Sequence, residues 1–214
     1  MLFHLIKKDF LIAKTHILII LILIGVMPLI YARLEPNMSG FFPFLYMVIV
    51  GEIVLLQSVS QLEAKNPKAA ALLCTTPYVR NTIVKAKYVF FILIFTYCYV
   101  MHTVITLLVN KTNLLDANSI LMVLLISVII YGTYMPIEFK YGVIKAKFIF
   151  ITTILVISLG PMLLSNLLPY ITIDFLLLPT IPPGIMNIVL ALVSIAVFAV
   201  SMMVSLKIFS KKEL

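Results

Sequence analysis

Charged residues are scarce in this chain. They make up 11% of its 214 residues, whereas hydrophobic residues make up 63% and the mean hydropathy is +1.19. A soluble domain is about half apolar and about a quarter charged. The shortage of charge therefore excludes a water-soluble fold and predicts a chain that is adapted to lipid.

The sequence also lacks the usual marks of metal and disulfide sites. The two cysteines, Cys74 and Cys98, form no CxxC motif, and the three histidines (His4, His16 and His102) are far apart. Closely spaced cysteines and histidines are the usual signature of a zinc site, and a reducing cytoplasm disfavours disulfides. We therefore expect neither a metal site nor a disulfide.

Catalytic motifs are missing as well. The sequence contains no G-x-x-x-x-G-K-[ST], no H-E-x-x-H and no G-x-S-x-G. Its one long polar stretch, residues 60–87, is shorter than a typical folded domain. We expect that the chain is not an enzyme and binds no cofactor, so that any ATP and Mg²⁺ would be bound by a separate subunit.

Long apolar runs dominate what remains. A bilayer core needs about 20 apolar residues per helix. The sequence predicts an all-α integral membrane protein, a single transmembrane domain over residues 1–214 with six spans: Thr15–Tyr31, Phe41–Val59, Tyr88–Val109, Ser119–Tyr134, Phe148–Leu168 and Ile185–Phe209. No small-residue cleavage site follows the first span, so we expect it to be retained.

Basic residues are distributed unevenly between the two sides of these spans. Fourteen of the 16 Lys and Arg residues flank the spans on one side, and only Arg33 and Lys111 lie on the other. Because basic residues stay in the cytoplasm, this bias predicts cytoplasmic termini and two cytoplasmic basic loops. Such residues meet anionic lipid headgroups, so the net charge of +8 does not indicate nucleic-acid binding.

The polar stretch between spans two and three has two helix-start signals. Asn66-Pro67 and Thr76-Pro77 each place Pro after a capping residue. We expect a short helix at Pro67–Cys74 and a second helix that starts at Pro77 and continues into span three. At the N-terminus, residues 1–14 fit either an interfacial helix or a simple basic flank.

Two further segments stand out. Leu167–Gly184 is apolar but rich in Pro, which predicts a re-entrant or interfacial hairpin on the outer face. Residues 83–95 and 143–155 share Lys-Ala-Lys within similar apolar sequence. This similarity fits either a duplication or two independent pairs of lysines that anchor helices at the headgroups.

Glu52 is an acidic residue well inside a predicted span. Such a residue costs about 3 kcal/mol to insert, so it should face protein or water. It is either a pathway or proton-linked carboxylate, or a buried contact with a neighbour such as Asn187. In the last span, Ser194, Ser201 and Ser205 share one helical face, which favours close helix packing.

The loop motifs resemble those of the small six-span permeases of the ABC-2 transporter family, which include bacterial exporters of lantibiotics, bacteriocins and phenol-soluble modulins. The matching pieces are Lys8-Asp9-Phe10, Glu63-x-Lys65-Asn66, Thr76-Pro77-x-x-Arg80, Ile83-Val84-x-x-Lys87-Tyr88, Met135-Pro136-Ile137-Glu138-Phe139-Lys140-Tyr141-Gly142 and Lys145-Ala146-Lys147. The last motif ends in Lys147, where family members tend to have Arg.

This resemblance implies an ABC-2 (type V exporter-like) fold in a bacterial cytoplasmic membrane. It implies an N-terminal interfacial helix, a cytoplasmic coupling helix between spans two and three, an outer re-entrant element, and a permease dimer above two ATPase subunits. The ATPase-coupling residues would be Glu63, Lys65, Asn66, Pro67, Lys68, Thr76, Pro77 and Arg80. The second cytoplasmic loop would contain Glu138, Lys140, Gly142 and Lys145.

Two other classes of protein remain open. An ion-coupled secondary transporter usually has inverted repeats and several intramembrane charges, whereas the weak repeat here is parallel. A bacteriocin-immunity or scaffold protein would bind no ATPase. Within the ABC-2 interpretation, the apolar interior favours export of amphipathic peptides or other hydrophobic substrates.

Overall fold

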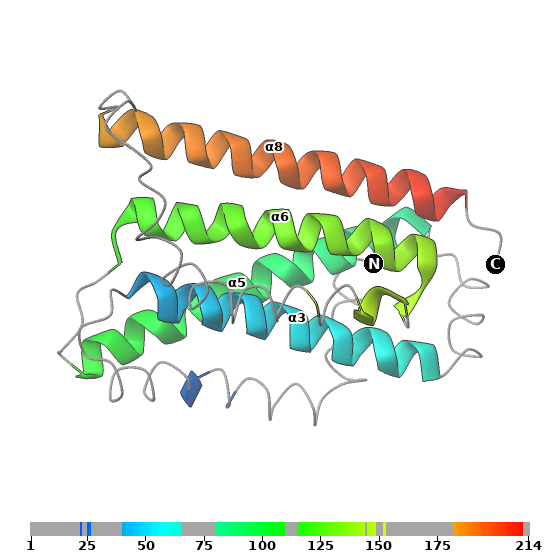
Figure 1. Ribbon diagram of the computed structural model, residues 1–214, viewed down its shortest axis with the longest axis horizontal. Helices are drawn as coiled ribbons and strands as arrows, with labels where there is room; N and C mark the ends of the chain where they lie inside the picture. Colours follow the sequence, from blue (N-terminus) through cyan, green and yellow to red (C-terminus); the bar gives the residue numbers. More distant parts are fainter. Residues whose placement is uncertain are drawn as a thin grey trace, which may run out of the picture.

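The described part of the chain is built from four long helices. The computed structural model describes residues 22, 25–26, 40–65, 80–109, 115–143, 145–148, 152 and 182–211. Within them lie α3 (Phe41–Lys65), α5 (Arg80–Val109), α6 (Ala117–Tyr141) and α8 (Pro183–Ser210) (Figure 1). Each is long and apolar enough to cross a membrane, so the described regular structure is helical and membrane-spanning.

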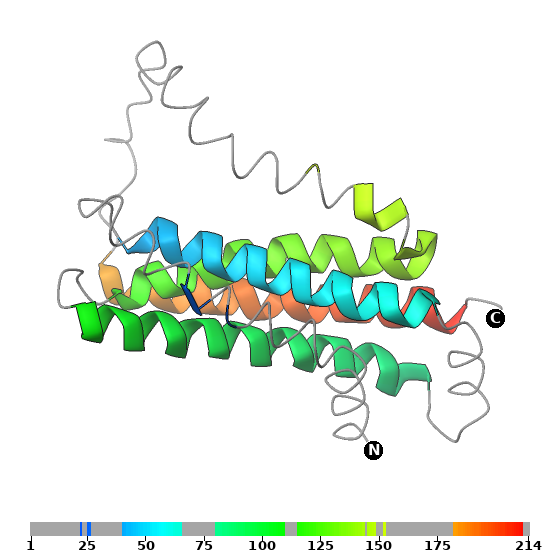
Figure 2. The ribbon, with the colours of Figure 1, turned by 90° about the horizontal axis from the view of Figure 1, so that it is seen from below.

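Three helices run in the same direction and α5 runs against them (Figures 1 and 2). Side-chain contacts give the same arrangement. Lys87, near the start of α5, bonds Ser60 near the end of α3 and Glu138 near the end of α6. The end of α6 and the start of α8 therefore lie at opposite ends of the bundle, as they would if one more span separated them.

Several helices extend beyond their predicted limits. The second span was predicted to end at Val59, but α3 continues to Lys65. The fourth was predicted to end at Tyr134, but α6 continues to Tyr141. The helix that was expected to run into span three is continuous from Arg80. The polar residues that flank the apolar runs predict loops, whereas in the structure they continue the helices past the apolar core.

Pro136 lies inside α6, where its ring removes the backbone N–H that would bond the carbonyl of Gly132. The hydroxyl of Ser201 on α8 donates to that same carbonyl at 2.8 Å. Side-chain hydroxyls of this kind allow proline inside transmembrane helices. The helix then ends at Gly142, whose φ of 84° suits glycine.

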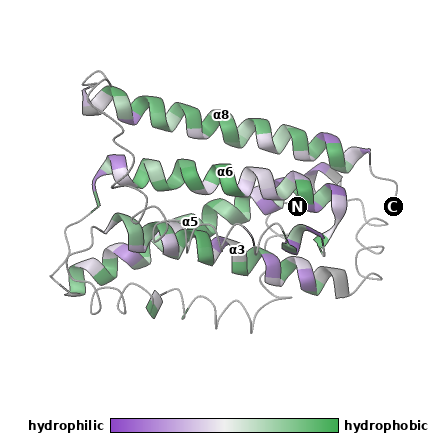
Figure 3. Cartoon of the chain, viewed as in Figure 1, coloured by the Kyte–Doolittle hydropathy of each residue, from purple (hydrophilic) through white to green (hydrophobic). Residues whose placement is uncertain are grey.

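Helices α6 and α8 pack closely along one face. Gly132 allows this approach, because a Cβ on it would lie 3.2 Å from Ser201. Ser194, Ser201 and Ser205 are all buried, which confirms the packing role predicted for that serine face. The opposite face of α8 exposes large apolar side chains, and Figure 3 shows α8 as mainly hydrophobic.

The remaining predicted elements lie largely or wholly outside the described residues. They are the interfacial helix at residues 1–14, the spans Thr15–Tyr31 and Phe148–Leu168, the short helix Pro67–Cys74 and the hairpin Leu167–Gly184. Of the first span, Gly25 lies against Met101 of α5. Of the hairpin, Pro183 and Gly184 belong to α8.

Candidate functional site: a buried polar junction

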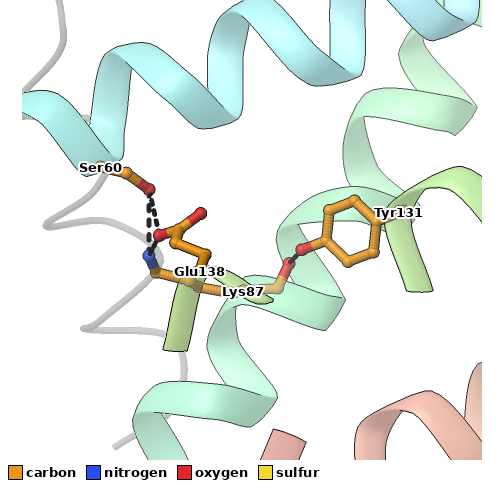
Figure 4. A network of polar contacts seen from close by, with 4 residues as sticks. All are labelled: Ser60, Lys87, Tyr131 and Glu138. Atoms are coloured by element: carbon orange, nitrogen blue, oxygen red, sulfur yellow. Dashed lines mark hydrogen bonds and ion pairs between the residues drawn. The ribbon is translucent and has the colours of Figure 1, made fainter. Parts of the chain in front are cut away.

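Three polar side chains meet near one end of the bundle, each from a different helix (Figure 4). Lys87 Nζ of α5 lies 2.9 Å from Glu138 Oε1 of α6 and donates to Ser60 Oγ of α3 at 3.1 Å. The Ser60 hydroxyl in turn donates to Glu138 Oε1 at 2.7 Å. We call Ser60, Lys87 and Glu138 the polar junction.

The polar junction is shielded from solvent. Ser60, Lys87 and Glu138 are 1%, 7% and 5% exposed. A buried ion is costly unless it is paired and hydrogen-bonded. The ammonium has two oxygen acceptors here and the ring of Phe139 at 5.5 Å. Each charge is therefore held in place by the other, and α3, α5 and α6 are joined at this level.

A second polar layer connects α5 to α6 and α8. The Tyr131 hydroxyl donates to the backbone carbonyl of Lys87 at 2.7 Å. Tyr88 Oη lies 2.7 Å from Ser201 Oγ and 2.8 Å from Ser205 Oγ. Ser201 already gives its proton to Gly132, so Tyr88 must donate to Ser201, and Ser205 must donate to Tyr88. This chain of donors has one direction and links all three helices.

The structure divides the predicted ATPase-coupling residues between two groups. Glu63 and Lys65 close α3, and Arg80 opens α5, so they stand at the two helix ends that this segment joins. The other members lie outside the described residues: Asn66, Pro67, Lys68, Thr76 and Pro77. The polar junction is adjacent to both described ends.

The residues assigned to the second cytoplasmic loop are placed differently from the prediction. Glu138 and Lys140 belong to α6, and only Gly142 and Lys145 follow it. Glu138 is buried, whereas Lys140 and Lys145 are exposed. The motif therefore contributes one side chain to the bundle interior and exposed basic groups to its end.

Glu52 is buried in the middle of α3, as expected for an acidic group inside a span. It is 3% exposed, and its Oε1 atom has no hydrogen-bond partner among the described residues. The suggested contact with Asn187 is not made, because the described residues include no hydrogen bond between Glu52 and Asn187. Glu52 is therefore a buried carboxyl separate from the polar junction.

Lys87 was missed as an interior residue because it was counted with the basic flank. A usable signal was its spacing from Lys85. Residues two apart on a helix point about 200° apart, so both lysines could not face the same environment. Lys85 is exposed and Lys87 is buried. The same spacing separates buried Glu138 from exposed Lys140.

Comparison with known proteins agrees with this membrane architecture. A family model described as "ABC-2 family transporter protein" matches residues 4–210, which is nearly the whole chain. A search of curated proteins finds no match. The match extends over all four described helices and over both segments that carry the loop motifs. The chain therefore belongs to the ABC-2 transporter family and is a membrane-embedded permease subunit of that family.

Proposed function

We propose that this chain is the six-span permease subunit of an ABC exporter in a bacterial cytoplasmic membrane. Both termini would lie in the cytoplasm, and two permease copies, identical or different, would stand above two ATPase subunits. The helix directions support this topology, because α3, α6 and α8 end on the side where α5 begins. So do the exposed lysines that cluster toward the ends of α6 and α8 and the start of α5, namely Lys85, Lys140, Lys145, Lys147, Lys207 and Lys211.

The polar junction is the observation that carries the mechanism. It joins the end of α3 and the start of α5, which flank residues 66–79, to the end of α6, which precedes the second basic segment. A force applied to residues 66–79 would therefore reach three helices together. Packed elements with fixed contacts transmit displacement in this way.

In this mechanism ATP binding closes the ATPase pair, which pushes the coupling segment Glu63–Arg80. The basic groups Lys65, Lys68 and Arg80 would contact a groove on the ATPase. The joined helices α3, α5 and α6 would move as a unit and open the permease interface outward. Each step depends on the coupling segment, so that segment is the place to test the proposal.

The substrate class that fits best is an amphipathic peptide or another hydrophobic molecule. The described helices contribute few ionisable groups to the interior, and Glu52 is a buried carboxyl whose Oε1 has no hydrogen-bond partner among the described residues. A pathway lined mainly by apolar side chains favours substrates that themselves partition into lipid. Glu52 would supply a polar or proton-linked group along that pathway.

Charge reversal in the coupling segment tests the proposal. The variant Lys65→Glu/Arg80→Glu would be purified with its ABC ATPase and reconstituted in proteoliposomes. We expect normal membrane insertion and loss of substrate-stimulated ATPase activity, because the basic contacts would become repulsive. Lys211→Glu is the matched control, since this exposed basic residue follows α8 and lies outside the coupling segment. Full stimulation in the double variant, or no ATPase that co-purifies with the wild type, would contradict the proposal.

A further inference from the structure

A small cavity lies at the end of the bundle away from the polar junction. Its volume is about 240 Å³, and it is lined by Tyr99, His102, Thr103 and Thr106 of α5 and by Leu115, which precedes α6. His102 lies fifteen residues after Lys87 on the same helix, which is about 22 Å along the axis. In the predicted orientation the cavity is therefore near the outer surface of the membrane.

Two lining side chains are deeply buried and polar. His102 is 5% exposed and Thr106 is 6% exposed. The His102 ring packs against Phe44 of α3 with 5.2 Å between centroids, which fixes its position. The lining α5 residues recur at intervals of three and four, so they share one helical face. The cavity is formed by this face of α5 and by the residue that precedes α6, with the His102 ring held against α3.

The protons of the two threonine hydroxyls in the described lining are already committed. Thr103 donates to the carbonyl of Tyr99, and Thr106 donates to the carbonyl of His102 at 2.8 Å. A hydroxyl has one proton and two lone pairs. Both threonines can therefore only accept further hydrogen bonds, and a ligand that bonds them has to donate.

The neutral ring of His102 also offers the cavity a hydrogen-bond acceptor. Its Nδ1 atom lies 3.5 Å from Thr106 Oγ1, whose proton is used elsewhere. The weak contact is favourable only with a proton on Nδ1, which leaves Nε2 as the acceptor. Three lining groups thus present acceptors: Thr103, Thr106 and His102.

A protonated primary amine matches this lining. An ammonium group has three donors and no acceptor, whereas a carboxylate or phosphate would set its own acceptors against those of Thr103, Thr106 and His102. The Tyr99 ring offers a face for a cation. Asp116, which follows the lining residue Leu115, is exposed and adds a carboxylate near this end of α6. The volume equals about eight water molecules at ~30 Å³ each, so it holds one headgroup and not a whole peptide.

We propose that this cavity binds the single ammonium group of an amphipathic amine at the outer end of α5. Two sources share this chemistry: a lysine side chain of an amphipathic peptide, and the ethanolamine headgroup of a lipid. Binding needs no ATPase, so the inference goes beyond the proposed export function. It can be tested separately from it.

The test uses the full chain in phosphatidylcholine nanodiscs with His4→Gln and His16→Gln, so that His102 is its only imidazole. Octylammonium is titrated and the ¹⁵N shifts of His102 are recorded, with n-octanol as the neutral matched probe. We expect a saturable shift with octylammonium and none with octanol. Equal shifts with both probes, or no saturable shift, would overturn the proposal.

Variants locate the binding to the hydroxyls. Thr103→Val/Thr106→Val should weaken octylammonium binding at least about tenfold, since each lost acceptor faced a charged donor. Thr103→Ser/Thr106→Ser keeps the hydroxyls, and its affinity for octylammonium should stay within about twofold of the parent.

If the valine variant does not fold, Asp116→Asn replaces it and should weaken octylammonium binding several-fold at low salt. Asp116 makes no side-chain capping bond, so this change spares the helix. Unchanged octylammonium affinity in a folded valine variant would exclude the site. If Asp116→Asn is used instead, unchanged affinity in that variant would exclude it.

Two further samples separate the sources of the amine. Nanodiscs that contain phosphatidylethanolamine should show the shift without any probe if the lipid headgroup is the ligand. A lysine-containing amphipathic peptide should produce it, and its ε-acetylated form should not, if the peptide is the ligand. If the ¹⁵N shift appears with octylammonium but with neither phosphatidylethanolamine nor the peptide, the site binds an amine only at high probe concentration. That result would overturn the assignment.

Discussion

Lys85 and Lys87 lie two positions apart on α5, and the helix directs them to different environments. Lys85 reaches the outside, whereas Lys87 Nζ is enclosed by Glu138 and Ser60. An ammonium buried without an anion would lose its hydration and gain little in return. Glu138 therefore stabilises the fold mainly because it keeps the buried Lys87 ammonium from being unpaired. Lys87 does the same for the buried Glu138 carboxylate.

Removal of one member of this pair should destabilise the protein strongly. Lys87→Met leaves Glu138 buried and unpaired, and we expect a loss of about 3–5 kcal/mol in unfolding free energy. The double variant Lys87→Met/Glu138→Leu removes both charges and should recover most of that loss. Denaturant titration in mixed micelles would measure each variant.

Lys85→Met is the matched control for the lysine change. It makes the same substitution two residues away at an exposed position, so its effect should stay within about 0.5 kcal/mol. Equal effects of Lys85→Met and Lys87→Met would show that the buried pair contributes nothing specific.

Helix α6 contains a proline whose cost is reduced by its neighbour α8. Pro136 leaves the carbonyl of Gly132 without its usual helical donor, and Ser201 supplies one. The close approach that this bond requires is possible because position 132 has no side chain. The proline, the glycine and the serine thus form one arrangement, although 69 positions separate the two bonded residues.

A double-mutant cycle tests that arrangement. Ser201→Ala should cost about 1–3 kcal/mol, because it leaves the buried Gly132 carbonyl unsatisfied. In a Pro136→Ala background the new backbone N–H can bond Gly132, so the same serine change should cost less by about 1 kcal/mol. The loss of the Tyr88 contact is common to both backgrounds and cancels. Identical costs in the two backgrounds would show that Ser201 does not compensate for the proline.

The sequence predicts that these helices exist, but it predicts the positions of their ends less well. Long apolar runs identify α3, α5, α6 and α8 because lipid demands about 20 such residues. The ends at Lys65, Arg80 and Tyr141 extend into polar sequence, which hydropathy alone reads as loop. A transmembrane helix continues while its backbone bonds are satisfied, and polar side chains do not stop it.

At the scale of the whole molecule, the relative directions of the described helices were predictable from the sequence, but the side chains that pair between them were not. The basic residues indicated which helix ends share a side, and α3, α6 and α8 do end on the side where α5 begins. The pairing of Lys87 with Glu138 depends on which helices pack together, and no local pattern in either helix contains that information. The similarity of residues 83–95 and 143–155 also has a limit, because Lys87 is buried whereas Lys147 is exposed.

The two ends of α6 give a direct test of orientation. The helix runs from Ala117 to Tyr141, about 37 Å, which is enough to cross the hydrocarbon core. Asp116 and Lys140 are exposed at its opposite ends. In a chain with Cys74→Ser and Cys98→Ser, an impermeant maleimide should label Asp116→Cys in intact cells but not Lys140→Cys. In permeabilised cells the maleimide should label both cysteines, which shows that each thiol is reactive. The positive-inside rule predicts this orientation. Labelling of Lys140→Cys from outside would invert the topology and place the polar junction and the coupling segment away from any cytoplasmic ATPase.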